Sequence, residues 1–206
     1  MFINTKGVLL LQSSHQVLHD VFGFDQFRGA QESIVEHVVS GGDALVLMPT
    51  GAGKSLCYQI PSLVRRGVGV VVSPLIALMQ DQVDALTQLG VRASFLNSSL
   101  DAVSSQKVTS QLLSGDLDLI YVAPERLMSP SFLSILDRLN AGPGIALFAI
   151  DEAHCISQWG HDFRPDYRRL VNILQRMPAN VPILGTTATA NNRVIEDVHN
   201  QLGDIG

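Results

Sequence analysis

The chain has 206 residues, 46% of them hydrophobic and 16% charged, which suits one globular domain with a sizeable core. Its formal net charge of -5 excludes a protein that binds nucleic acid chiefly through bulk positive charge, so any such contact must be local. No apolar run reaches the length of about 18 residues that a membrane span needs, and the apolar stretch near the N-terminus lacks the features of a signal peptide.

Six short apolar runs alternate with longer amphipathic segments along the chain. The runs lie at residues 44–48, 69–73, 92–96, 117–122, 145–150 and 181–186. They are rich in Val, Ile and Leu and lack strict polar alternation, which is typical of strands buried on both faces of a parallel sheet. Between them, residues 75–90 and 101–115 have helical patterns, the second opening at Asp101 as a predicted N-cap. This alternation predicts a single doubly wound α/β domain with helices on both faces of a mostly parallel sheet.

The first apolar run leads into the sequence "MPTGAGKSL". Gly51 and Gly53 allow the backbone N–H groups of a strand-to-helix loop to turn toward an anion at the helix N-terminus. Lys54 supplies a positive charge for the β- and γ-phosphates, and the Ser55 hydroxyl can ligate Mg²⁺. The usual phosphate-loop pattern has a further glycine where this chain has Met48, so an incidental glycine-rich turn is the alternative. The predicted nucleotide-binding residues of the loop are Thr50, Gly51, Ala52, Gly53, Lys54 and Ser55.

Two adjacent carboxylates, Asp151 and Glu152, follow the fifth apolar run. In phosphate-loop enzymes an acid at the end of a neighbouring strand holds Mg²⁺, and a second acid can orient and deprotonate the attacking water. The alternative is that both acids only cap a helix that begins near Ala153. Together with the loop, the pair predicts nucleotide hydrolysis, with Lys54, Asp151 and Glu152 as catalytic residues and Ser55 and Asp151 as the Mg²⁺ ligands.

Six blocks, in this order, resemble the successive motifs of the RecQ family, a superfamily 2 group of ATP-dependent DNA helicases. The blocks are residues 22–35, 48–61, 71–83, 121–127, 150–170 and 184–190. The resemblance implies a RecA-like fold, with residues 1–206 as the first RecA-like lobe and residues 1–30 as its N-terminal helical region. It also implies that the second lobe and the C-terminal domains are absent from this chain, which alone should hydrolyse very little ATP.

By the same resemblance, "FGFDQFRGAQ" forms an adenine pocket. Phe24 stacks on one face of the base, Arg28 covers the other, and the Gln31 amide reads the base edge, since an amide both donates and accepts hydrogen bonds. The alternative is that the aromatic side chains of this block are simply core. We expect Phe22 and Phe27 to be core residues and Phe24 not to be.

The segment after "DEAH" resembles the aromatic-rich loop with which RecQ enzymes sense single-stranded DNA. Bases stack on aromatic faces regardless of sequence, and Arg164 adds a local positive charge. Trp159 and Phe163 can instead be ordinary packing residues, and the threonines near residue 187 can be turn or N-cap residues. No cysteine–histidine spacing indicates zinc, so we expect the histidines to be network residues. The predicted DNA-binding or coupling residues are Ser73, His154, Gln158, Trp159, His161, Phe163, Arg164, Thr187 and Thr189.

The resemblance implies ATP and Mg²⁺ as cofactors, and single-stranded and partially duplex DNA and a second RecA-like lobe as partners. No membrane partner is expected. The alternatives are a DEAH-type RNA-directed ATPase and a non-catalytic interaction module, although the intact Lys54, Asp151 and Glu152 argue against the second. We predict that Cys57 and Cys155 are reduced, which is typical of an intracellular protein. With the helicase resemblance, we expect a cytoplasmic protein associated with the nucleoid, or a nuclear one if the source is eukaryotic.

Overall fold

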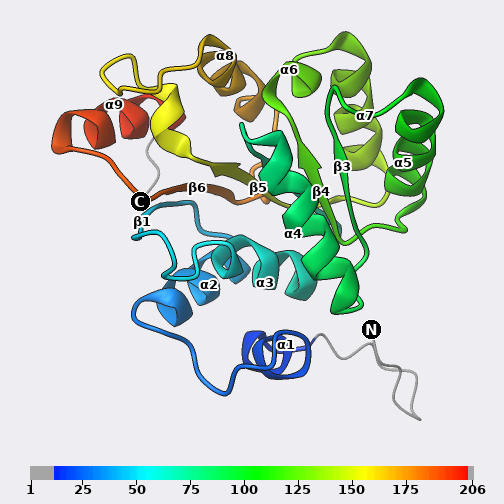
Figure 1. The fold of residues 1–206 in the computed structure, drawn as a ribbon, viewed down its shortest axis with the longest axis horizontal. Coiled ribbons are helices and arrows are strands. Elements are labelled where there is room, and N and C mark those ends of the chain that lie inside the picture. Colours follow the sequence, from blue (N-terminus) through cyan, green and yellow to red (C-terminus); the bar gives the residue numbers. More distant parts are fainter. Residues whose placement is uncertain (1–11, 204–206) are drawn as a thin grey trace.

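The computed structural model describes residues 12–203. Their centre is a six-stranded, all-parallel sheet with the strand order β1-β6-β5-β2-β4-β3 (Figure 1). The strands are β1 Ala44–Leu47, β2 Val68–Val72, β3 Ala93–Leu96, β4 Leu119–Val122, β5 Ile145–Asp151 and β6 Ile183–Thr187. All six predicted runs therefore form strands, with bounds that differ from the prediction by up to two residues.

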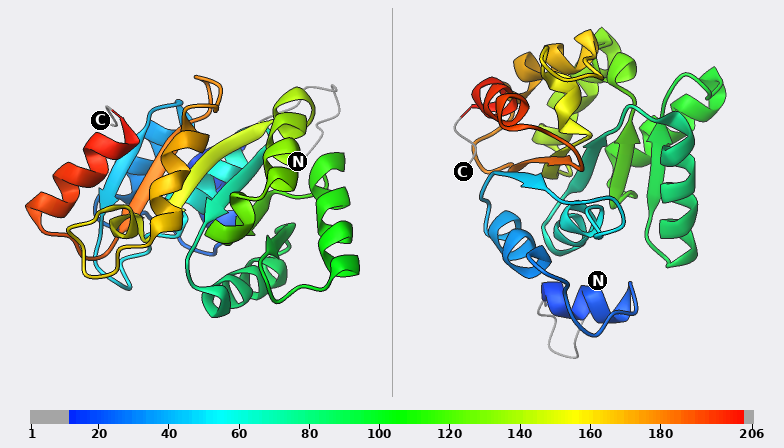
Figure 2. Two further views of the ribbon diagram at one scale, coloured as in Figure 1. Left: turned by 90° about the horizontal axis from the view of Figure 1, so that it is seen from above. Right: turned by 60° about the vertical axis from the view of Figure 1, so that its left-hand side comes forward.

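Helices cover both faces of the sheet, as Figure 2 shows from two further directions. On one side lie α1 Ser14–Asp20, α2 Gln31–Val39, α3 Leu56–Val64 and α4 Ile76–Gln88. On the other lie α5 Ala102–Ser114, α6 Pro124–Leu127, α7 Pro130–Ala141, the 3₁₀ helix η1 Ala153–Ile156, α8 Pro165–Leu174 and α9 Asn192–Leu202. Within residues 12–203, no helix is both long and apolar enough to span a bilayer.

Buried side chains divide between the two faces because successive residues of a strand point in opposite directions. In β2, Val70 and Val72 pack into the larger cluster under α5, α7, α8 and α9. Val71 packs on the opposite face, in the cluster that includes Met79 and Val83 of α4. All three valines are fully buried, as expected for a central parallel strand without polar alternation.

The N-terminal helical region docks on α3 through a small apolar cluster. Val17 and Leu18 of α1 are buried there against Ile60. Phe22 and Phe27 are half-buried against this part of the core, as predicted, whereas the side chain of Phe24 is exposed. The part of the predicted region before residue 12 lies outside the described residues.

Candidate nucleotide site and the adjoining loop

The phosphate loop connects β1 to α3 at the carboxyl edge of the sheet. Gly51 and Gly53 have φ angles of 82° and 81°, a left-handed conformation that glycine adopts without steric cost. The first turn of α3 follows immediately, so its free N–H groups face the loop. Ser55 is the N-cap residue of α3, but its side chain makes no capping hydrogen bond. Its hydroxyl is therefore available to a ligand.

The loop and the acid pair line one cavity of about 330 Å³. This arrangement requires β1 and β5 to lie close together, and only β6 separates them in the sheet. Within the described residues, the Lys54 ammonium makes no ion pair. The lining residues include Thr50, Gly51, Gly53, Lys54, Ser55, Ser73, Asp151 and Glu152. A cation, a hydroxyl and two carboxylates around one space fit a Mg²⁺–triphosphate group.

Asp151 ends β5 beside β6, where its Cα pairs with that of Thr186. The Thr186 hydroxyl donates a hydrogen bond of 2.8 Å to Asp151 Oδ1. The Tyr167 hydroxyl donates a hydrogen bond of 3.0 Å to the backbone carbonyl of Asp151. Burial raises the pKa of the Asp151 carboxyl, and the Thr186 bond opposes that rise. The carboxylate is therefore held in a fixed orientation at the edge of the cavity.

Glu152 has a φ of 53°, and it is the only non-glycine residue with positive φ within residues 12–203. Its side chain makes no capping hydrogen bond to η1, so Glu152 does not serve as a side-chain cap of this helix. Instead, Glu152 Oε2 lies 3.3 Å from Nδ1 of His154. This hydrogen bond is the main cause that lowers the pKa of Glu152, and nearby Lys54 adds to it. Glu152 is thus kept ionised, as a general base must be.

A second cavity, of about 260 Å³, adjoins the first at the phosphate loop. It is lined by Phe24, Arg28 and Gln31, and it shares Gly51, Gly53 and Ser55 with the first cavity. The predicted adenine pocket therefore lies next to the predicted phosphate site.

The buried Gln31 amide ties this pocket to the phosphate loop. Its Oε1 accepts a hydrogen bond of 2.8 Å from the Arg28 N–H, and its Nε2 donates bonds of 3.2 Å to the carbonyls of Ala52 and Gly53. Both amide protons are thus used inside the protein, and Oε1 keeps one lone pair for a base. The Arg28 guanidinium lies over the Phe24 ring, 5.7 Å from its centroid, so a base that enters between them must displace Arg28.

The loop between η1 and α8 carries the predicted DNA-sensing residues. The Trp159 side chain is 57% exposed, and the Arg193 guanidinium of α9 stacks on its ring at 3.5 Å from the centroid. Below it, the buried Ser157 hydroxyl donates a hydrogen bond of 2.7 Å to Asp197 of α9. Gln158 is exposed, whereas Phe163 is half-buried. An exposed tryptophan at the tip of an anchored loop favours a binding role over core packing.

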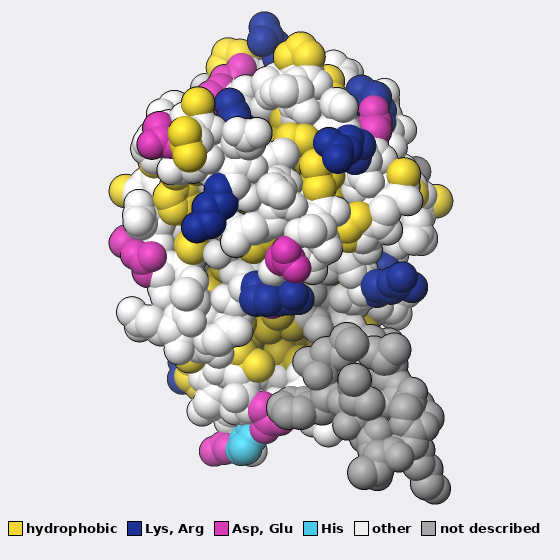
Figure 3. Space-filling model, turned by 90° about the vertical axis from the view of Figure 1, so that its right-hand side faces the viewer, with side chains coloured by type: hydrophobic (Ala, Val, Ile, Leu, Met, Phe, Trp, Pro, Cys, Tyr) yellow, Lys and Arg dark blue, Asp and Glu magenta, His cyan; other side chains and the backbone are white. Residues whose placement is uncertain are grey.

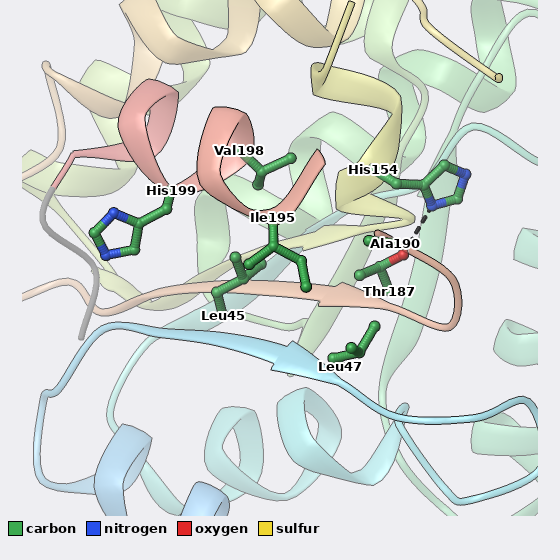
Figure 4. Close-up of a pocket in the computed structure, with 8 residues that line it drawn as sticks. All are labelled: Leu45, Leu47, His154, Thr187, Ala190, Ile195, Val198 and His199. Atoms are coloured by element: carbon green, nitrogen blue, oxygen red, sulfur yellow. Dashed lines mark hydrogen bonds between the residues drawn. The ribbon is translucent and has the colours of Figure 1, made fainter. Parts of the chain in front are cut away.

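His154 connects this loop to the acid pair. Its Nδ1 lies 2.8 Å from the Thr187 hydroxyl, as Figure 4 shows, in addition to its contact with Glu152. The exposed His161 ring stacks on the His154 ring with centroids 5.8 Å apart. His154 and His161 therefore form part of a network, as predicted from the sequence. A movement of the loop can therefore be transmitted to Glu152 through the His154 side chain.

The described part of the face in Figure 3 shows lysine and arginine side chains scattered singly, with acidic side chains among them. A bulk basic surface is thus lacking there, in agreement with the net charge of -5. Contacts with nucleic acid on this face would depend on stacking and on individual polar groups.

A known protein family matches most of the chain, including the phosphate loop, the acid pair and the loop that follows η1. The family described as "DEAD/DEAH box helicase" matches residues 28–198, which include every strand of the sheet. The chain belongs to the DEAD/DEAH box helicase family. The DEAH-box helicase family predicted from the sequence is thereby confirmed.

Curated relatives of this helicase chain are RecQ DNA helicases. It is 47% identical over 196 residues to the ATP-dependent DNA helicase RecQ of Pasteurella multocida, a match that covers 95% of this chain and 30% of the relative. It is 44% identical over 190 residues to the RecQ-like DNA helicase BLM of Xenopus laevis, which covers 91% of this chain and 14% of that protein. The predicted RecQ resemblance is confirmed. The chain spans less than one third of either relative.

The fold of the helicase chain also recurs among solved structures. The crystal structure of a hypothetical ATP-dependent RNA helicase from Sulfolobus tokodaii superposes with a TM-score of 0.69 at 19% identity, over 94% of this chain and 55% of that one. At this identity the likeness concerns the fold alone. It confirms the predicted RecA-like α/β architecture.

Three of the predicted coupling residues lie in different surroundings. Ser73 is buried and lines the nucleotide cavity, so it faces the phosphate loop. Thr187 is buried in the His154 network, and its hydroxyl donates to the Thr189 carbonyl. Thr189 itself is exposed in a cavity of about 530 Å³ that Trp159 also lines. Of these three, only Thr189 is exposed.

Sequence reasoning missed several residues of this helicase site. Thr186, which orients Asp151, belongs to the sixth apolar run, and only the register of β6 against β5 brings it there. Arg193 and Asp197, which hold the loop, follow the last motif and carry no signal of their own. Gln59 was also missed: its Nε2 bridges to Gln82 of α4 at 3.0 Å and thus links the helices that follow β1 and β2.

Proposed function

We propose that this chain is the first, ATP-binding lobe of a RecQ-type helicase that couples ATP hydrolysis to movement along single-stranded DNA and to duplex unwinding in repair and recombination. The observation that carries the proposal is the single cavity in which Lys54, Ser55, Asp151 and Glu152 meet, with a base-sized cavity on one side. The names of the relatives, all DNA helicases, support the substrate.

The chain's own residues account for the first steps of hydrolysis. The glycine loop and the α3 N-terminus bind the phosphates, Lys54 neutralises the β- and γ-oxygens, and Ser55 and Asp151 are placed to hold Mg²⁺. Bound Mg²⁺ would neutralise charge on the transferred phosphoryl group. Glu152 orients a water molecule and accepts its proton as the water oxygen bonds to the γ-phosphorus and the bond to ADP breaks.

Coupling to DNA follows from the path between the loop and Glu152. A base that stacks on the face of Trp159 that Arg193 covers would displace the Arg193 guanidinium. The loop would then move relative to α9, and His154 would carry that movement to Glu152 through its contact of 3.3 Å. In this proposal Glu152 responds to DNA as well as to ATP.

An RNA-directed ATPase is the principal competitor for this proposal. The proposal is tested with a longer chain that contains both lobes, in which single-stranded DNA should stimulate ATP hydrolysis far more than RNA of the same sequence. Equal or greater stimulation by RNA would contradict it. Calorimetry with residues 1–206 tests the nucleotide separately: the pocket of Phe24, Arg28 and Gln31 predicts tighter binding of ATP than of GTP.

A further inference from the structure

Three side chains with different metal-binding atoms converge where η1 meets the loop that follows it. They are His154, Cys155 and Asp162, and their ligand atoms all lie within 4.8 Å of one another. The individual distances are 3.8 Å from Cys155 Sγ to His154 Nε2, 3.6 Å from Sγ to Asp162 Oδ2, and 3.9 Å from Nε2 to Oδ2. No pattern in the sequence indicates this group, because Asp162 lies seven positions after Cys155 and no second cysteine lies near.

These separations resemble one face of a coordination tetrahedron. A tetrahedral zinc ion with bonds of about 2.0–2.3 Å places its ligand atoms about 3.3–3.6 Å apart. The sulfur–oxygen distance of 3.6 Å already lies in that range, and the sulfur–nitrogen and nitrogen–oxygen distances of 3.8 and 3.9 Å must shorten by about 0.2–0.6 Å, which side-chain rotations can provide. Imidazole, thiolate and carboxylate are all zinc ligands, and the thiolate selects against Mg²⁺ and Ca²⁺.

The hydrogen bonds of His154 leave the required nitrogen free. The Thr187 hydroxyl donates its only proton to the Thr189 carbonyl, so it accepts from Nδ1–H of His154. The Glu152 carboxylate lies on the same side, 3.3 Å from Nδ1. The lone pair is therefore on Nε2, which faces Cys155 and Asp162. A histidine whose other nitrogen donates to an oxygen is the usual arrangement at zinc sites.

Asp162 is oriented in a similar way. Its Oδ1 lies 3.7 Å from Nε of Arg164, whereas Oδ2 faces the cysteine and the histidine. Its side chain is 46% exposed, so solvent reaches the cluster at Asp162, and His154 also lines a cavity of about 530 Å³. A water molecule can complete the coordination from that side.

We propose that His154 Nε2, Cys155 Sγ and Asp162 Oδ2 form a binding site for a zinc-like divalent ion, distinct from the Mg²⁺ site at Ser55 and Asp151. On binding, the sulfur–metal bond forms and the thiol proton leaves to solvent. The ion joins the residue that contacts Glu152 to the loop that carries Trp159. It would hold this loop in the position that the structure shows, so that zinc restrains the DNA-sensing segment.

Cobalt absorption tests the site in the 206-residue chain, freed of metal and kept in excess Mg²⁺ to fill the oxygen site. One equivalent of Co²⁺ should give a thiolate-to-metal charge-transfer band with tetrahedral d–d bands, and Zn²⁺ should remove both. Cys155→Ser should abolish the charge-transfer band, and Asp162→Asn should weaken Co²⁺ binding by more than about tenfold. The matched control is Cys57→Ser, which changes the other buried cysteine and should keep the spectrum.

Absence of the charge-transfer band in the unaltered chain would overturn the proposal. So would a band that survives Cys155→Ser but disappears in Cys57→Ser. Circular dichroism of each variant shows whether it is folded. Replacing the fully buried Cys155 by serine can impair folding, whereas Asp162 is half-exposed and tolerates asparagine. If Cys155→Ser does not fold, the Asp162→Asn variant tests the site. Unchanged Co²⁺ affinity in Asp162→Asn excludes the site.

Discussion

At the scale of single residues, Lys54 and Gln31 contribute to the phosphate loop in two different ways. Lys54 makes no ion pair within the described residues and faces the cavity, where a phosphate would meet it. Gln31 is buried and holds the loop carbonyls of Ala52 and Gly53. A Cβ on Gly53 would lie 2.3 Å from Nε2 of Gln31, so only glycine fits beside it. The first residue is placed to bind, and the second shapes the loop.

Replacing Lys54 by alanine should weaken Mg²⁺–ATP binding about 10- to 100-fold, because a hydrogen bond to a charged group contributes about 1.5–3 kcal/mol. Calorimetry with residues 1–206 measures the change. Lys107→Ala is the matched control: this lysine is exposed on α5, away from the cavity, and its loss should leave the affinity unchanged. Equal affinities in both variants would refute the role of Lys54.

At the scale of elements, the ends of helices show how local chemistry determines the fold. The predicted N-cap Asp101 accepts a hydrogen bond of 2.6 Å from the Ser104 N–H, and α5 ends at Gly115 with a φ of 79°. That hydrogen bond lowers the pKa of Asp101, so the carboxylate remains charged at neutral pH.

Asp101→Ala should reduce the free energy of unfolding by about 1 kcal/mol, since it leaves a helix N–H without its partner. For a chain of this size, the melting temperature should fall by about 2–4 °C. Asp84→Ala, which removes an exposed carboxylate from the middle of α4, provides the comparison and should have almost no effect. Denaturant or thermal unfolding of the two variants distinguishes them.

The loop between η1 and α8 is the element on which the DNA response should depend. In a chain with both lobes, Trp159→Ala should leave basal ATP hydrolysis nearly unchanged, because the phosphate ligands remain. Stimulation by single-stranded DNA should collapse, since a stacking contact of about 1–3 kcal/mol is lost. ATPase rates with and without DNA measure both quantities. A variant that is only less stable, with stimulation intact, would show that Trp159 has a structural role.

At the scale of the whole molecule, residues 12–203 form one sheet with one nucleotide cavity at its carboxyl edge. Members of the helicase family that this chain resembles close such a cavity with a second lobe, which brings an arginine to the transition state. In related phosphoryl-transfer enzymes such an arginine contributes about 10³–10⁵ in rate.

Residues 1–206 alone should therefore bind ATP but turn it over near background, with or without single-stranded DNA. A longer chain that includes the second lobe should recover a DNA-stimulated rate. Steady-state ATPase assays compare the two, with Glu152→Gln in each to reveal any contaminating activity. A strong rate from residues 1–206 that Glu152→Gln abolishes would show that this lobe is catalytically sufficient.

The sequence by itself was enough to predict the six strands, the phosphate loop and the acid pair. Their signals are local: buried parallel strands are continuously apolar, and a loop that binds phosphate needs glycines next to a lysine and a serine. The adenine pocket was predicted only through the resemblance to RecQ helicases, which could be recognised because Phe24, Arg28 and Gln31 lie within eight consecutive residues.

Only the tertiary structure decided which side chains support these motifs. Thr186 reaches Asp151 because β6 pairs with β5 in a particular register, and Arg193 reaches Trp159 because α9 packs beside the loop. The group of His154, Cys155 and Asp162 likewise forms only when the loop folds back on η1. Such contacts depend on distances between segments that are far apart or irregular, and neither residue type nor spacing in the sequence encodes those distances directly.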